Sequence, residues 1–174
     1  MERRCQIRGF SKMSLSWKEA FFRQAQADYK VFSDFNKKNA LLCHQLHFFQ
    51  MATEKLGKSF LAYNHSKPPK KSHYVFVRFL QTCKGRPEIR KQLLFSDARF
   101  FAQFIDGLLP LAKKIEELAP SAEMERPNPE YPWMDYKTGQ ILSPISFEFP
   151  EYSLHNPKLE KLNKLVKDLF QISL

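Results

Sequence analysis

Residues 40–80 read ALLCHQLHFFQMATEKLGKSFLAYNHSKPPKKSHYVFVRFL, and this stretch decides the fold class. Its first part predicts an amphipathic helix over about residues 39–63, because its core-facing positions recur at alternating spacings of four and three. At about 1.5 Å per residue this helix would be roughly 37 Å long, which is typical of a helical bundle. Pro68 and Pro69 then force a turn, because proline cannot continue a helix. The core-facing positions are Leu42, Leu46, Phe49, Thr53, Leu56, Phe60 and Tyr63.

Polar and small residues in this stretch predict contacts with neighbouring helices. Gly57 lies in the middle of the predicted helix, where glycine is costly, so we expect it to let another helix approach closely. Glu54 and Lys58 form an i,i+4 pair, and Lys55 lies between them. We expect this group to make a polar contact with Asp28 or a neighbouring helix, with a ligand contact as the alternative.

Further helices are predicted on both sides of this stretch. Ser16 and Glu19 form a capping box that begins a helix reaching about residue 36. A third helix is expected over residues 72–83, although residues 74–77 also fit a strand. Three more are expected over residues 87–94, 96–120 and 156–172, with their starts marked by Pro87, by Ser96 or Asp97, and by Asn156-Pro157. Pro110 predicts a kink in the long helix after Gly107.

Residues 121–156 are rich in proline and aromatic residues. We expect an ordered loop that wraps over the bundle, with a short strand at residues 145–149, because the aromatic content is too high for disorder. The fold class predicted from these patterns is all-α, a bundle of about five helices. One domain is expected over residues 14–174, after a disordered basic arm at residues 1–13.

The positive charge of the chain is concentrated in one block. The 174 residues have a net charge of +10, and residues 67–91 hold eight basic side chains against one acidic residue, Glu88. Such a block favours an anionic partner, and we expect RNA or a nucleotide rather than a membrane. The apolar runs are far shorter than the roughly 20 residues that a membrane-spanning helix needs. The candidate phosphate-binding residues are Lys67, Lys70, Lys71, Arg78, Lys84, Arg86, Arg90 and Lys91.

Other chemistry-bearing residues give weaker signals. Cys5, Cys43 and Cys83 are too far apart for a CxxC pair and too few for a disulfide framework, so we expect a reducing, cytoplasmic environment. His44 and His47 have a spacing that can ligate a metal, but no further ligand completes the set, and we expect no metal. No glycine-rich phosphate loop occurs, which excludes nucleotide hydrolysis of the P-loop type, and no cofactor is expected.

Several motifs occur in an order that is typical of one family. The chain resembles the HEPN domain over about residues 17–80, an all-helical family of nucleotide- and RNA-associated proteins, and Tyr131-Pro132 looks like a later motif of that family. The resemblance implies a homodimer formed through long helices and a partner protein of the nucleotidyltransferase type. The motifs that carry it are Trp17 with Ala20, Gln24-Ala25 with Asp28-Tyr29, Gln50-Met51-Ala52 with Glu54-Lys55 and Lys58, and Pro68-Pro69 before Ser72-His73.

The chain departs from this family at the residues that carry ribonuclease activity. His73-Tyr74-Val75 stands where the family has His-Asp-Leu, and Glu130 stands where it has Arg before Tyr-Pro. No Arg is followed by a His four to six residues later, which is the spacing of the family's ribonucleases. We therefore expect a nucleotide- or RNA-binding protein or a partner subunit without that activity.

Two alternatives remain open at this point. Metal-free RNA cleavage needs a His to move protons and a cation to stabilise the developing charge. His73 and Arg78, five residues apart, could supply this pair in the reverse order, which gives a divergent endoribonuclease as the first alternative. The second is an interaction module with no anionic ligand.

Overall fold

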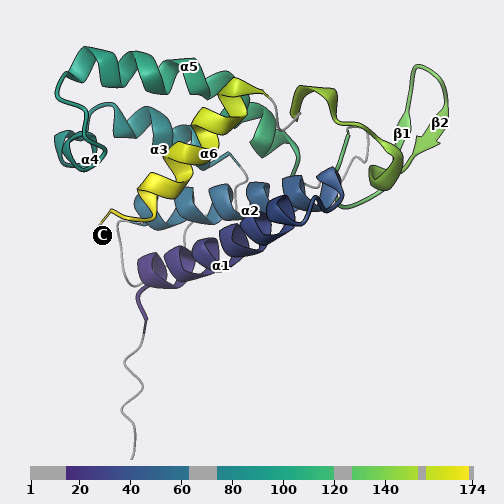
Figure 1. The fold of residues 1–174 in the computed structure, drawn as a ribbon, viewed down its shortest axis with the longest axis horizontal. Helices are drawn as coiled ribbons and strands as arrows, with labels where there is room; N and C mark the ends of the chain where they lie inside the picture. Colours follow the sequence, from purple (N-terminus) through teal and green to yellow (C-terminus); the bar gives the residue numbers. More distant parts are fainter. Residues whose placement is uncertain (1–14, 63–73, 120–126, 153–155, 173–174) are drawn as a thin grey trace, which may run out of the picture.

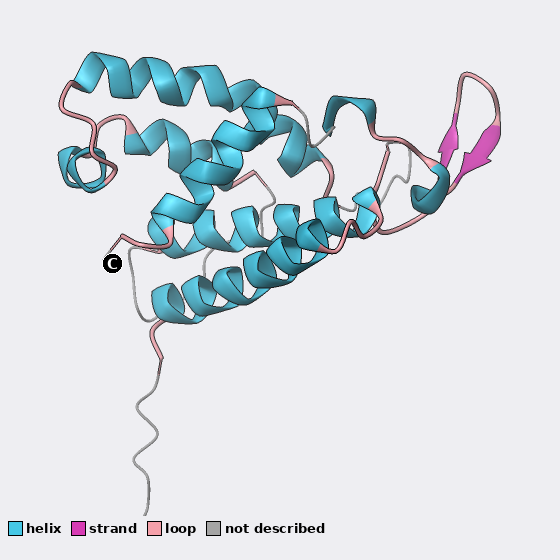
Figure 2. Cartoon of the chain, in the orientation of Figure 1, coloured by secondary structure: helices cyan, strands magenta, loops and turns pink. Residues whose placement is uncertain are grey.

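The protein is an all-α bundle, as the sequence predicts (Figure 1, Figure 2). The computed structural model describes residues 15–62, 74–119, 127–152 and 156–172. The described residues contain six α-helices and one two-stranded hairpin. None of the described helices is both long and apolar enough to cross a bilayer. The helices are α1 (Trp17–Lys37), α2 (Leu42–Leu61), α3 (Phe76–Cys83), α4 (Pro87–Gln92), α5 (Ala98–Glu117) and α6 (Pro157–Leu169).

The helix starts follow the predicted capping residues. The Ser16 hydroxyl accepts a hydrogen bond from the Glu19 backbone N–H at 3.2 Å, while the Glu19 carboxylate accepts from the Ser16 N–H at 3.0 Å. The carboxylate of Asp97 caps α5, and the side chain of Asn156 caps α6, whose first residue is Pro157. These caps satisfy backbone donors that have no partner within the helix, so each start is determined locally.

Several predicted boundaries change in the structure. The second helix begins at Leu42 rather than at residue 39, because Asn39 has a left-handed φ of 50° and the Ala40 N–H bonds back to the Phe35 carbonyl. The helix α5 continues through Pro110 and ends at Glu117, before the predicted end at Pro120. Residues 76 and 77 are helical, so the strand alternative there is wrong.

In the core, α2 packs against α1 on one side and against α3 and α5 on the other (Figure 1). The helix α6 packs against α5 and also contacts α1, where the Tyr29 hydroxyl donates to Asn163 at 2.7 Å. The rings of Phe32 and Phe49 lie 4.7 Å apart between α1 and α2. The rings of Phe60 and Phe79 stack at 4.4 Å between α2 and α3. The predicted apolar stripe of α2 is therefore the centre of the bundle.

Gly57 lets α3 approach α2 closely, as predicted. A Cβ added at Gly57 would lie 2.9 Å from the Cα of Phe76 and 2.9 Å from the carbonyl oxygen of Val75. Real Cβ atoms do not approach backbone atoms this closely, so only glycine fits where α3 begins.

A buried ion pair ties α1 to α2. Asp28 is almost fully buried in α1, and it accepts hydrogen bonds from Lys55 of α2 and from the side-chain amide of Gln24. Lys58 pairs with Glu54 one turn further along α2. The predicted polar contact of this group with Asp28 is confirmed.

The segment before α6 differs from its prediction. Residues 144–146 form a short 3₁₀ helix and Phe149 has a left-handed φ of 45°, so the strand predicted at residues 145–149 is wrong. Proline 144 and proline 150 border that segment and have no N–H to donate to a neighbouring strand. The strands are instead β1 (Trp133–Asp135) and β2 (Gln140–Leu142), which pair antiparallel.

The hairpin of β1 and β2 extends beyond one end of the bundle and does not wrap over it (Figure 1). Its base is fixed by Trp133, Phe149 and Tyr152, which are buried, and the Tyr152 hydroxyl donates to the Lys114 carbonyl at 2.9 Å. The hairpin is therefore anchored at its base, and its strands leave the core.

We predict that Gly57→Ala lowers the free energy of unfolding by roughly 1–3 kcal/mol, because the added methyl group overpacks the contact with α3. The control is Gly107→Ala in α5, where an added Cβ meets nothing within 4 Å. That control is expected to raise stability by up to about 1 kcal/mol through helix propensity. Urea unfolding followed by circular dichroism measures both, and equal effects of the two substitutions would contradict the close contact.

We also predict that Lys55→Met lowers the free energy of unfolding by about 3 kcal/mol, because it leaves the buried Asp28 carboxylate without its cation. Combining it with Asp28→Leu removes both charges and should recover most of that loss. The two variants are compared by urea unfolding at neutral pH. A double variant that is less stable than Lys55→Met would show that the pair contributes more than its burial costs.

Candidate functional site

The predicted phosphate-binding residues divide between described and undescribed parts of the chain. Arg78 lies in α3, Lys84 and Arg86 lie in the connection to α4, and Arg90 and Lys91 lie in α4. The other predicted residues, Lys67, Lys70, Lys71 and the candidate catalytic His73, lie outside the described residues.

Some of these cations stabilise the fold. The Lys84 ammonium pairs with Asp106 of α5 at 2.7 Å. The Arg90 guanidinium donates to the Phe95 carbonyl at 2.9 Å and also to the Ser96 carbonyl, which ties α4 to the loop before α5. Arg86 also has an interaction partner. The basic block therefore presents fewer unpaired charges than its composition suggests.

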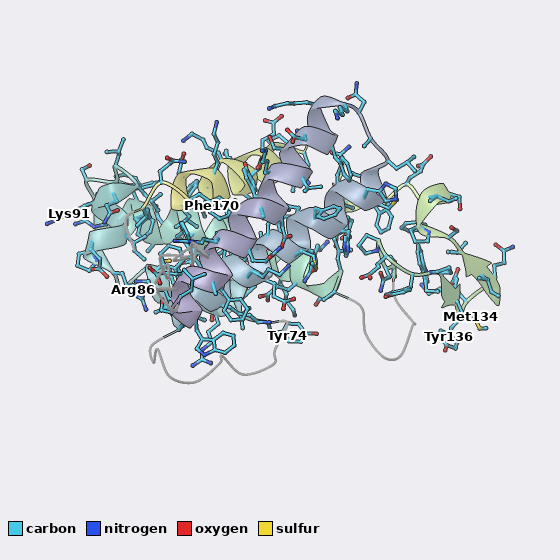
Figure 3. The ribbon with its side chains drawn as sticks, turned by 90° about the horizontal axis from the view of Figure 1, so that it is seen from below. Tyr74, Arg86, Lys91, Met134, Tyr136 and Phe170 are labelled. Atoms are coloured by element: carbon cyan, nitrogen blue, oxygen red, sulfur yellow. The ribbon has the colours of Figure 1, made fainter. Side chains whose placement is uncertain are left out.

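Two cations that pair with no described residue lie near the corner where α4 meets α5, while Arg78, also without an ion pair to a described residue, is exposed on α3. Lys91 and Arg99 are exposed, and neither forms an ion pair with a described residue. Figure 3 shows Lys91 and Arg86 at the same end of the molecule, well separated from Tyr74 at the start of α3. Arg99 lies outside the block that the sequence identified, although it is only eight residues beyond its end.

Two apolar side chains are exposed at the same corner, which we call the α4–α5 corner and define by Lys91, Leu94, Arg99 and Phe100. The Phe100 side chain is 69% exposed in the first turn of α5, and Leu94 is 91% exposed. Leu94 has a left-handed φ of 63° and ends the turn that follows α4. The exposure of Phe100 could not be predicted from the sequence, because Phe100 adjoins Phe101, which is buried.

An apolar hollow of about 340 Å³ lies beside this corner, between the α4–α5 connection and α6. Phe104 lines it, one helical turn after Phe100, and its ring lies 5.1 Å from that of Phe95. An ion pair of Lys164 and Asp168, 2.7 Å apart, borders it from α6. The corner thus combines cations, an exposed ring and an apolar hollow.

A buried carboxylate fixes the helix that leads to this corner. Glu116 of α5 is 2% exposed, and its Oε1 accepts hydrogen bonds from the backbone N–H groups of Phe76 and Val77, the latter at 3.1 Å. Its Oε2 is buried and has no hydrogen-bond partner among the described residues. Burial, with a smaller contribution from the charges of Glu54 and Glu117, raises the pKa of Glu116 to about 7 against the effect of these two donors.

The two helical histidines lie near the end of α2 that faces the hairpin segment. His47 Nδ1 lies 3.6 Å from the Glu130 carboxylate, and His44 is exposed. Among the described residues no group of three or more His, Cys, Asp or Glu side chains could hold a metal ion. Cys43 and Cys83 are buried free thiols, and burial raises the pKa of both.

No family model, no curated protein and no solved structure matches the chain. The function of the α4–α5 corner must therefore be argued from its own residues. Those residues are two unpaired cations and two exposed apolar side chains.

We predict that the protein loses stability as the pH rises from about 4.5 to 7. The pKa of Glu116 is higher in the folded chain than in the unfolded chain, so the folded state binds more protons in this range and each rise in pH favours unfolding. The full shift corresponds to about 3 kcal/mol. Glu116→Gln removes this ionisation, so the difference in unfolding free energy between pH 5 and pH 8 should shrink. Glu160→Gln, at an exposed carboxylate of α6 that does not act on Glu116, is the control and should keep the wild-type pH dependence.

Proposed function

We propose that this protein is a HEPN-like helical domain that binds single-stranded RNA through the α4–α5 corner without cleaving it. The observation that carries the proposal is the exposed ring of Phe100, which follows the exposed and unpaired Arg99 in the first turn of α5. An aromatic ring exposed to water among cations is the arrangement on which nucleic-acid bases stack.

The charges of the corner supply the attraction for phosphate. Residues 84–100 hold five basic side chains against two acidic ones, in a chain with a net charge of +10. Lys91 and Arg99 are each exposed and unpaired with any described residue, so each can displace counterions from a phosphate. Binding should therefore weaken as the salt concentration rises.

The exposed ring favours a single strand over a duplex. Bases in a duplex already stack on one another, whereas bases of a single strand are available to stack on protein side chains. Residues 84–100 contain no histidine, so the corner offers no side chain that transfers protons near neutral pH. Binding without cleavage is the activity that these residues support.

The alternatives from the family resemblance have less support. Arg78 is exposed in α3, but its proposed catalytic partner His73 lies outside the described residues. A partner subunit for a nucleotidyltransferase-type protein is compatible with the corner as an RNA-holding surface. Cleavage of labelled RNA that disappears in His73→Ala would favour the endoribonuclease over the binding protein.

We predict that Phe100→Ala raises the Kd for a fluorescein-labelled 15-nucleotide single-stranded RNA by about tenfold, since stacking contributes about 1–3 kcal/mol per base. Fluorescence anisotropy at low salt measures the Kd. Lys91→Ala and Arg99→Ala should each weaken binding and flatten the dependence of log Kd on log salt by about 0.7.

The controls place the same residue types elsewhere on the surface. Tyr131→Ala removes another exposed aromatic ring, and Lys113→Ala removes an exposed lysine of α5. Both should bind RNA as the wild type does. Equal affinity of Phe100→Ala and the wild type would rule out the α4–α5 corner as the contact surface.

A further inference from the structure

The hairpin exposes apolar side chains on its outer face. Met134 of β1 and Ile141 of β2 are directly paired across the strands, and they are 43% and 76% exposed. Tyr136 in the turn and Ile145 after β2 are exposed as well. Figure 3 shows Met134 and Tyr136 together at the far end of the molecule from Lys91. Contiguous apolar side chains on an element that extends from the core are typical of a contact surface.

The segment that carries the hairpin is acidic. Residues 127–152 hold four carboxylates against one lysine. Hydrogen bonds from the Lys137 backbone N–H and the Thr138 hydroxyl lower the pKa of Asp135 at the end of β1, which keeps this carboxylate charged. The exposed apolar face therefore belongs to a segment with a net negative charge, in which Glu130 and Glu151 lie beside His47 of α2 and Lys114 of α5.

The α4–α5 corner complements this surface in both charge and polarity. Residues 84–100 have a net positive charge where residues 127–152 have a net negative one. The corner also exposes Phe100 and Leu94, and Leu94 lines the apolar hollow together with Phe104. Opposite charges around apolar centres favour one orientation of two surfaces and disfavour contact of either surface with itself.

The two surfaces cannot meet within one molecule. The hairpin and α4 lie at opposite ends of the bundle (Figure 1), and the base of the hairpin is anchored by buried Trp133 and Phe149. We propose that the hairpin of one copy docks on the α4–α5 corner of a second copy. This head-to-tail contact is heterologous, because different surfaces of the two copies meet, and it therefore adds copies in a chain or a ring.

The contact is small, so we expect association at micromolar or higher concentrations, weakened by salt. It also covers Phe100, so RNA and the hairpin of a second copy compete for the same ring. That last consequence rests on the proposed RNA binding, whereas the self-association does not.

The test uses the full chain and two sets of substitutions at exposed positions. The hairpin variant carries Met134→Thr and Ile141→Thr, because threonine keeps the strand propensity. The corner variant carries Leu94→Asn and Phe100→Ser, because asparagine tolerates the left-handed conformation of residue 94. The control is Leu15→Ser, which removes an exposed apolar side chain next to α1. Circular dichroism confirms that each variant is folded.

Sedimentation velocity at low salt over a range of concentrations gives the outcome. The wild type and Leu15→Ser should associate, and the hairpin and corner variants should each be monomeric. Mixing the two variants should give a one-to-one dimer and nothing larger, because each copy contributes its one intact surface. A monomeric wild type, a single variant that still associates, or a mixture that stays monomeric would each overturn the inference.

RNA binding by the same variants separates this inference from the proposed function. The hairpin variant should bind RNA at least as tightly as the wild type, and the corner variant should bind it weakly. Self-association without RNA binding would overturn only the RNA proposal. RNA binding by a wild type that stays monomeric would overturn only the head-to-tail contact.

Discussion

The hydrogen bonds from the first turn of α3 to the Glu116 carboxylate are the interaction on which the rest of the structure depends. The N-terminus of a helix favours a negative charge, whereas burial disfavours it, and the raised pKa of Glu116 shows that burial has the larger effect here. The carboxylate of α5 thereby holds α3 at the point where Gly57 of α2 leaves room for it. The helices α2, α3 and α5 are therefore fixed relative to one another by the Glu116 side chain and by the absence of a Cβ at Gly57.

The position of α3 determines where the connection to α4, the helix α4 and the loop before α5 lie. The chain leaves α3 at Cys83 and enters α4 at Pro87, so only three residues separate the two helices. Lys84 then pairs with Asp106, and Arg90 holds two carbonyl groups of the next loop. These cations act as structural ties, which is why a basic sequence block is a poor measure of the charge available to a ligand. Among the described cations of the block, Arg78 and Lys91 form no ion pair with a described residue, and Arg99 follows just beyond the block.

The parts of the fold that depend on local interactions could be predicted from the sequence. Caps at Ser16, Asp97 and Asn156 involve neighbouring residues, so their patterns are visible in the chain. Gly57 predicted that another helix approaches α2 closely, but it did not identify that helix as α3. The role of Glu116 depends on a contact with residues 40 positions away, and its place near the end of a helix gives no sign of burial. The hairpin has strands of only three residues, too short for an alternating pattern to show.

The two ends of the bundle differ in the way they expose apolar side chains. At the hairpin they stand outward on a pair of strands, and at the α4–α5 corner Leu94 borders an apolar hollow. A single-stranded RNA has phosphates and rings but no aliphatic groups to fill the hollow beside Phe104. A second hairpin has both aliphatic side chains and carboxylates. In the proposed scheme the RNA and the second hairpin both contact Phe100 and the cations, and only the hairpin fills the hollow. Binding of RNA must therefore weaken binding of the hairpin, and binding of the hairpin must weaken binding of RNA by the same factor.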